Sequence, residues 1–196
     1  NAGKSTLLNH LLGEERAIVS PHAGTTRDAI DTEIVWHGQR VSLIDTAGIR
    51  KRGSIEPGVE KYSVIRAMNA IDRADVALLI FDGIDGVTEQ DEHIAGYVLD
   101  AYKGLVLLVN KWDAVEKDAH TMNAFTETVR ERLHFAPYAP LLFISALTGQ
   151  RIHQVLDVAN RVWENRSIRI QTSELNRLVR DALQHHPPPM KGTKRL

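Results

Sequence analysis

The chain contains no cysteine, so a disulfide framework, thiolate chemistry and a cysteine-based zinc site are excluded. It also lacks any run of about 18 apolar residues, so the sequence predicts no membrane partner. The formal net charge is only −1, but this balance hides an asymmetry. From Arg161 onward there are eight Lys/Arg and three Asp/Glu. We therefore expect the end of the chain to favour phosphate contacts with RNA.

The 196 residues suffice for one domain and part of a second, and a content of 43% apolar and 25% charged residues is ordinary for a globular protein. Continuous apolar runs alternate with helical patterns, which predicts an α/β fold with a mostly parallel sheet and helices on both faces. The predicted strands are residues 29–36, 39–44, 76–81, 105–109 and 141–144. The predicted helices are residues 6–12, 60–71, 89–101, 119–133 and 152–163.

The first six residues, Asn1, Ala2, Gly3, Lys4, Ser5 and Thr6, match the end of a phosphate-binding P-loop, G-x-x-x-x-G-K-S/T. A helix that begins near Lys4 points unpaired N–H groups and the positive end of its dipole at an anion. Gly3 lets the backbone approach closely, Lys4 can reach the β and γ phosphates, and the Ser5 hydroxyl can bind Mg²⁺. A short G-K-S at a helix start is common, so the rest of the pattern must decide its role.

Several apolar runs end in a polar residue: Asp45, Asp82, Asn110 and Ser145. Ligands of parallel sheets bind beyond the carboxyl ends of the strands, so these residues indicate a site. Asp45, at the start of Asp45-Thr46-Ala47-Gly48, suits Mg²⁺, and the Gly48 N–H suits a γ-phosphate. Thr26, in a loop of sequence T-T-R-D, can complete the Mg²⁺ shell while γ-phosphate is present. Taken alone, each stretch is also a plausible surface turn.

Asn110-Lys111-Trp112-Asp113 follows the strand 105–109. The Asp113 carboxylate can accept two hydrogen bonds from the N1–H and 2-amino group of guanine, which adenine does not offer. Asn110 can tie this strand end to the P-loop, and the Lys111 stem can lie along the base. The N–H groups of Ser145-Ala146-Leu147 can meet guanine O6. A polar strand-to-helix turn is the alternative for either stretch.

The ordered set G-K-S, T-T-R-D, D-T-A-G, N-K-W-D and S-A-L resembles a translation-factor-related GTPase. Further stretches, among them Gly48-Ile-Arg-Lys-Arg-Gly, Thr88-Glu-Gln-Asp and Ser173-Glu-Leu-Asn-Arg, resemble the Der (EngA) family of bacterial GTPases with two tandem G domains and a C-terminal KH-like domain. The resemblance implies a P-loop GTPase domain at 1–168, similar to the second G domain of that family, and the start of a KH-like domain at 169–196. It also implies a cytoplasmic monomer that binds GTP and GDP with Mg²⁺ and acts with the 50S ribosomal subunit and its rRNA in large-subunit assembly.

The resemblance also assigns roles to particular residues. It places catalytic roles on Lys4, Thr26 and Gly48, with Ser5, Thr26 and Asp45 around Mg²⁺. Asn1 resembles the potassium-binding Asn of related GTPases, so K⁺ is a second expected cofactor. In the implied fold a strand precedes Asn1, so we expect five strands and a strand-wide gap between residues 41–44 and 76–81.

The sequence departs from Ras-type enzymes at Ile49, which takes the place of the Gln that orients the attacking water. Ile49 still belongs among the expected nucleotide contacts. His22, in the switch stretch, is more typical of a surface residue than of a catalytic one. The pair His185-His186 is more typical of a helix end before three prolines than of a metal site. A nucleotide-independent RNA-binding or scaffold protein with a decayed G domain is the rival function. The intact Lys4 and other motif residues argue against it.

Overall fold

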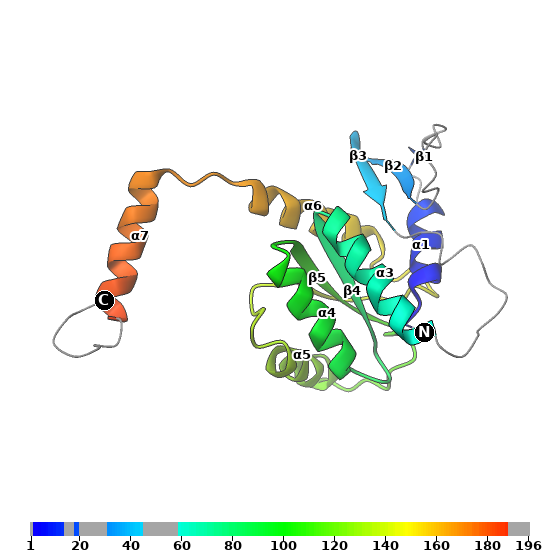
Figure 1. Ribbon diagram of the computed structural model, residues 1–196. Coiled ribbons are helices and arrows are strands. Elements are labelled where there is room, and N and C mark those ends of the chain that lie inside the picture. The colour runs from blue at the N-terminus through cyan, green and yellow to red at the C-terminus, as the bar shows by residue number, and fades with distance from the viewer. Residues whose placement is uncertain (1, 14–17, 20–30, 45–58, 188–196) are drawn as a thin grey trace. The chain divides into compact units, whose positions relative to one another are not determined.

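The structure is a computed structural model. It describes residues 2–13, 18–19, 31–44 and 59–187 (Figure 1). The chain divides into two compact units, Asn1–Trp163 and Glu164–Leu196. The division lies close to the boundary after residue 168 that the sequence predicts. The site predicted from the sequence belongs to the first unit, whose layers determine where the strand ends meet.

A parallel sheet forms the centre of the first unit, with the order β4 (Val76–Asp82), β5 (Gly104–Asn110) and β6 (Leu141–Phe143). All seven residues of β5 are buried. Successive side chains of a strand point to opposite faces, and those of β5 alternate between two hydrophobic cores. One core contains Leu105, Leu107 and Val109, whereas Val106 and Leu108 belong to the other. Both faces are therefore covered, which is why the strand reads as an unbroken apolar run.

Helices supply the residues that cover the two faces. On one face pack α3 (Val59–Arg73), α4 (Glu89–Asp100) and α5 (Thr121–Arg132), and on the other α1 (Lys4–Gly13) and α6 (His153–Ser167). The sequence specifies these helices locally, as α4 illustrates. Thr88 and Asp91 form a reciprocal capping box at its start, and Ala95 and Val98 on its inner side are fully buried. The expected fold class is thus confirmed.

A second, antiparallel sheet has the order β1 (Ile18–Val19), β2 (Thr32–Trp36) and β3 (Gln39–Leu43). The turn between β2 and β3 is His37-Gly38, as predicted, with positive φ at both residues (48° and 80°). The inward-facing side chains of β2, Ile34 and Trp36, lie in the same core as those of α1 and α6. The indole N–H of Trp36 also donates to Asp157 Oδ1 of α6 at 2.9 Å, which ties the hairpin to the body of the unit.

The predicted number of five strands is wrong, because the described residues contain six. The added strand is β1, which lies in what the sequence indicated to be a polar connector. Two residues carry too little periodicity to identify a strand, and β1 exists because it pairs with Val35 and Ile34 of β2. The expectation that residues 41–44 and 76–81 do not pair as neighbours is confirmed for the described residues, since β3 and β4 belong to separate sheets.

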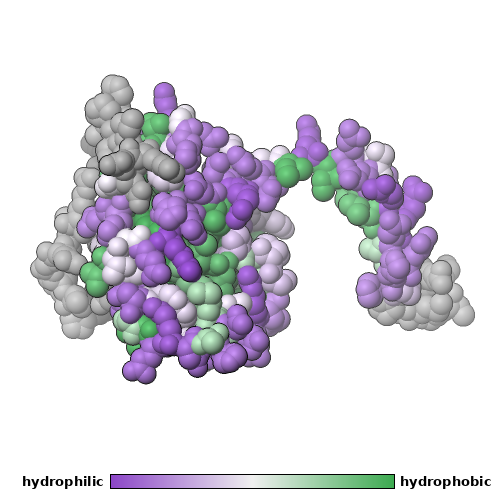
Figure 2. Space-filling model, turned by 180° about the vertical axis from the view of Figure 1, so that it is seen from behind, coloured by the Kyte–Doolittle hydropathy of each residue, from purple (hydrophilic) through white to green (hydrophobic). Residues whose placement is uncertain are grey.

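The second unit contains helix α7 (Thr172–His185). Its end agrees with the helix end predicted at His185-His186, but the sequence did not predict where it begins. Its apolar residues Leu175, Leu178, Val179 and Leu183 fall on one side by their spacing, and each is about half-exposed. Apolar colour is visible along this described part of the chain in Figure 2. Across the described ranges of both units, no helix combines the length and the hydropathy needed to cross a membrane.

Candidate functional site

Asn110 connects the three loops that the sequence analysis expects to meet. It is the last residue of β5, and its side chain is almost fully buried. Its Nδ2 donates to the Ala2 carbonyl at 2.7 Å, and its Oδ1 accepts from the Ala146 N–H at 2.8 Å. One amide thus joins the loop before α1, the end of β5 and the loop after β6. This confirms the predicted link between Asn110 and the start of the chain.

Gly3 makes this link sterically possible. Its φ is 86°, a left-handed conformation that glycine adopts without strain. A Cβ at this position would lie only 2.3 Å from Asn110 Nδ2. The sequence alone predicts that Gly3 lets the backbone approach a phosphate. The structure adds that Gly3 is needed for the close approach of Asn110.

Helix α1 begins directly after Gly3, as predicted for a P-loop. The Leu7 N–H bonds to the Gly3 carbonyl at 3.0 Å, and Leu7, Leu8 and Leu11 bury one side of the helix. Lys4 is exposed, whereas Ser5 and Thr6 are half-buried in the first turn. The first N–H groups of a helix have no partner within it, so this turn can accept an anion. The residue types fit a phosphate and a hydroxyl-bound divalent cation.

Lys111 forms an ion pair with Asp82, the last residue of β4. Burial by itself would raise the pKa of Asp82, but hydrogen bonds from Lys111 and the Ile84 N–H, together with the charge of Lys111, hold that pKa below its usual range. The hydrogen bond to Asp82 correspondingly raises the pKa of Lys111. Both groups are therefore charged at neutral pH. The sequence alone marks Asp82 as a strand end but does not predict this ion pair.

The neighbouring side chains of Trp112 and Asp113 differ in their surroundings: Trp112 is buried and Asp113 is exposed. The Trp112 ring is buried against Phe125 and Phe143, with ring centroids 5.7 Å and 4.4 Å away, and its backbone N–H donates to the Ile144 carbonyl. The Trp112 side chain therefore packs in the core. Asp113 is exposed, and among the described residues no group donates a hydrogen bond to its carboxylate. The carboxylate is thus free to accept from a ligand.

The loop Ser145-Ala146-Leu147 closes on itself and on Asn110. Ser145 is fully buried, and its Oγ accepts from the Thr148 N–H at 3.1 Å. Because the Ala146 N–H is bonded to Asn110, its predicted contact with guanine O6 would have to share or replace that bond. Leu147 is 75% exposed. The O6 contact stays a prediction.

The remaining predicted site residues fall outside the described part of the chain. They are Asn1, Thr26, Asp45, Thr46, Ala47, Gly48 and Ile49. Their roles with Mg²⁺, K⁺ and the γ-phosphate stay predictions. The described site therefore consists of the start of α1, the loop after β5 and the loop after β6, with Asp82 beside them.

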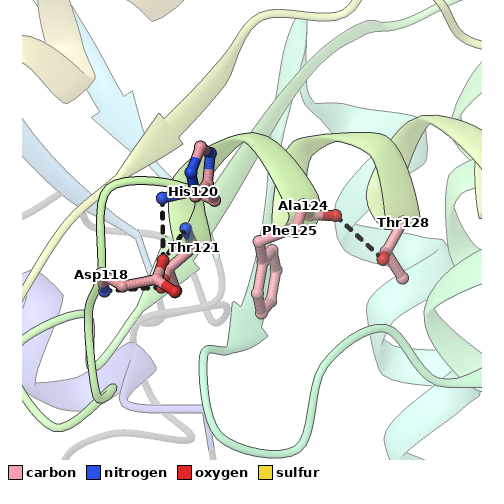
Figure 3. Close-up of a pocket in the computed structure, with 6 residues that line it drawn as sticks. All are labelled: Asp118, His120, Thr121, Ala124, Phe125 and Thr128. Atoms are coloured by element: carbon pink, nitrogen blue, oxygen red, sulfur yellow. Dashed lines mark hydrogen bonds between the residues drawn. The ribbon is translucent and has the colours of Figure 1, made fainter.

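An open depression lies apart from these motifs, at the start of α5 (Figure 3). Asp118 Oδ1 accepts from the His120 N–H, the Thr121 N–H and the Thr121 hydroxyl at 2.7–2.8 Å. These bonds, the one from Thr121 first, hold the pKa of Asp118 below its usual range. These polar groups form hydrogen bonds with one another. The depression is therefore explained by the structure at the start of α5, next to Phe125.

Comparison with known proteins places these motifs in a family. Residues 1–111 match the family of 50S ribosome-binding GTPases. The chain is 56% identical over 188 residues to a GTPase Der of Chloroflexus aggregans, covering 96% of this chain but 42% of that protein. The chain thus spans less than half the length of the curated relatives it matches.

Two solved structures share the fold. The translation elongation factor SelB of Methanococcus maripaludis matches with a TM-score of 0.63 at 17% identity, covering 88% of this chain and 33% of that one. Era in complex with MgGDPNP and nucleotides 1506-1542 of 16S ribosomal RNA matches with a TM-score of 0.53 at 25% identity, covering 99% and 56%.

Proposed function

Because the chain belongs to the 50S ribosome-binding GTPase family, we propose that it binds GTP and GDP and hydrolyses GTP as a switch in ribosome assembly. The observation that carries this proposal is the pair of hydrogen bonds from Asn110 to Ala2 and Ala146. They bring the turn at the start of α1 and the loops after β5 and β6 to the same edge of the sheet. The stability of the sheet alone does not require these three segments to meet at one edge.

Lys4 and the N-terminal turn of α1 bind the phosphates in this proposal. The ammonium supplies a point charge, and the unpaired N–H groups of the turn supply donors that are already oriented. The ammonium and the N–H groups both stabilise the negative charge on the β and γ phosphates. This stabilisation is stronger in the transition state than in the ground state, because charge develops there. Lys4 is exposed at the mouth of the turn, which leaves it free to reach a ligand.

Asp113 selects guanine. Its exposed carboxylate has no donor among the described residues, so it can accept from both N1–H and the 2-amino group. Lys111 and the backbone of Ser145-Ala146-Leu147 frame the base. An adenine would leave the carboxylate unpaired, which costs affinity and excludes ATP.

Mg²⁺ and K⁺ complete the proposed site. Ser5 would hold Mg²⁺ with Thr26 and Asp45, because hydroxyl and carboxylate oxygens are its preferred ligands. Mg²⁺ would neutralise phosphate charge. The MgGDPNP in the Era complex supports Mg²⁺ as the cofactor. Asn1 would hold K⁺ and so supply positive charge that Ras-type systems take from an arginine. Faster hydrolysis in K⁺ than in Na⁺ at equal ionic strength tests the Asn1 role, and equal rates contradict it.

The ribosomal role rests on the family and on the charge of the second unit. We propose that the protein is a cytoplasmic monomer that binds the 50S subunit and its rRNA, with residues 169–196 as the start of a KH-like domain. The family description names the 50S subunit, and Era was solved with ribosomal RNA. The excess of Lys and Arg after Arg161 suits phosphate contacts, so binding to 50S particles should weaken with added salt.

A titration of the complete protein with GTP, GDP and ATP tests the proposal most directly. We expect both guanine nucleotides to bind and ATP not to compete. Lys4→Ala is the matched variant, since it removes phosphate contacts from an exposed side chain without disturbing the core. Equal GDP binding by the parent and Lys4→Ala would contradict the P-loop role and favour the nucleotide-independent RNA-binding or scaffold function instead.

A further inference from the structure

The ion pair between Lys111 and Asp82 lies inside the proposed nucleotide site, yet none of the nucleotide-binding motifs includes Asp82. Asp82 ends β4 and is the register partner of Asn110 in β5, so Lys111 follows directly on the neighbouring strand. The Lys111 side chain crosses from one strand end to the other to reach the carboxylate. Its aliphatic stem is thereby held across the carboxyl edge of the sheet.

Both partners are themselves held in place. The Asp82 side chain is only 10% exposed, and its Oδ1 accepts the Ile84 N–H at 3.0 Å. The Asp82 carbonyl accepts from the Gly86 N–H at 2.9 Å, and the Gly83 N–H donates to the Asn110 carbonyl at 2.8 Å. A Cβ on Gly83 would lie 2.8 Å from that same carbonyl, so only glycine permits this approach. The carboxylate is therefore a fixed anchor.

The Lys111 backbone is strained as well. Its φ is 59°, a left-handed conformation that residues with a Cβ adopt rarely. Bonds on either side retain it, because Trp112 N–H donates to the Ile144 carbonyl and Ala114 N–H to the Lys111 carbonyl. Strained backbone persists where the surroundings over-determine it, which is common at ligand sites.

We propose that Asp82 is a positioning residue that orders the Lys111 side chain before the guanine nucleotide binds. A lysine side chain that is ordered only on binding loses rotamer entropy at that moment. With its ammonium held by Asp82, Lys111 presents its stem at the site and incurs little of that cost. Asp85 adds a second negative charge near the ammonium. This inference rests on the proposed function.

The test measures GDP affinity of the complete protein by calorimetry, with Lys4→Ala marking the signal that belongs to this site. Asp82→Asn keeps the shape of the side chain and removes its charge, and it should weaken GDP binding roughly tenfold. In a Lys111→Met background, where no ammonium remains to be held, Asp82→Asn should have less than about a twofold effect. Asp82→Glu should recover part of the affinity.

Glu92→Gln is the matched control. It removes the same charge from another ion pair between a carboxylate and a cation, more exposed than that of Asp82, with Glu92 2.8 Å from Arg132 on the α4–α5 surface away from the site motifs. Its GDP affinity should equal that of the parent. If Asp82→Asn does not fold, Asp82→Glu takes its place in the same comparison. Moving the carboxylate by one methylene should then weaken GDP binding when Lys111 is present and have little effect in the Lys111→Met background.

The outcomes separate the two proposals. A parent that binds no more GDP than Lys4→Ala overturns the proposed function, and this inference with it. A parent that binds, with Asp82→Asn equal to it, overturns only the inference. Equal losses from Asp82→Asn in both backgrounds also overturn it, since they mean that Asp82 acts on general stability and not through Lys111.

Discussion

Asn110 and Ala2 are 108 residues apart in sequence and joined by a 2.7 Å hydrogen bond from the side-chain amide to the backbone carbonyl. Asn110→Ala would leave the buried Ala146 N–H and the Ala2 carbonyl without this partner. We expect a loss of about 2–4 kcal/mol in unfolding free energy and a loss of GDP binding. Chemical denaturation and calorimetry measure the two. Asn69→Ala, on an exposed position of α3, is the control and should change neither.

Gly3→Ala should damage the site more than its single added methyl suggests. The methyl would meet Asn110 Nδ2, and the left-handed backbone costs about 1–2 kcal/mol for a residue with a Cβ. The expected result is a lower melting temperature and no GDP binding. Gly13→Ala is the matched control, because a Cβ at Gly13 meets nothing within 4 Å. Normal GDP binding by Gly3→Ala would contradict the steric argument.

Asp113→Asn should change base preference and leave the fold intact. The carboxylate is exposed and has no donor among the described residues, so no internal bond is lost. Asn presents a donor where guanine also presents one, which costs about 1–3 kcal/mol. Competition between GDP and XDP should shift toward the xanthine nucleotide. The neighbouring exposed change Glu116→Gln should leave the competition as in the parent.

Acid should weaken the fold partly through Asp82. Its pKa is lowered in the folded state, so the unfolded chain binds the proton more readily. The stabilisation is therefore complete above the unfolded value of about 3.9 and is lost as pH falls through the folded pKa. Denaturation curves at several acidic pH values should show a smaller pH dependence for Asp82→Asn than for the parent. Equal slopes would mean that Asp82 does not contribute.

Asp157→Ala should loosen the β2–β3 hairpin. The buried Trp36 indole loses the acceptor that it has 2.9 Å away, and because Asp157 is half-exposed water recovers part of the bond. We expect a loss of about 1 kcal/mol. Asp157→Asn keeps an oxygen acceptor and should lose less. Chemical denaturation measures the change, and equal effects of the two variants would argue against the hydrogen bond.

The sequence predicted the core of the parallel sheet well. The runs at 76–81 and 105–109 match β4 and β5 to within a residue at each end, because a strand buried on both faces must be apolar at every position. It failed where local signal was short. Ile18–Val19 became a strand only by pairing with β2. For α7 only the end at His185-His186 was predicted, although its apolar spacing is helical.

By itself, the sequence determined which chemical groups stand at the strand ends and at the start of α1. Gly3 and Lys4 indicate a phosphate-binding turn, and Asp113 a guanine-reading carboxylate, because few other residue types have the required geometry or charge. Only the tertiary structure decided which of them meet. The bonds of Asn110 to Ala2 and Ala146, and of Lys111 to Asp82, join residues far apart in the chain. Such pairs depend on strand order and register, which local patterns do not encode.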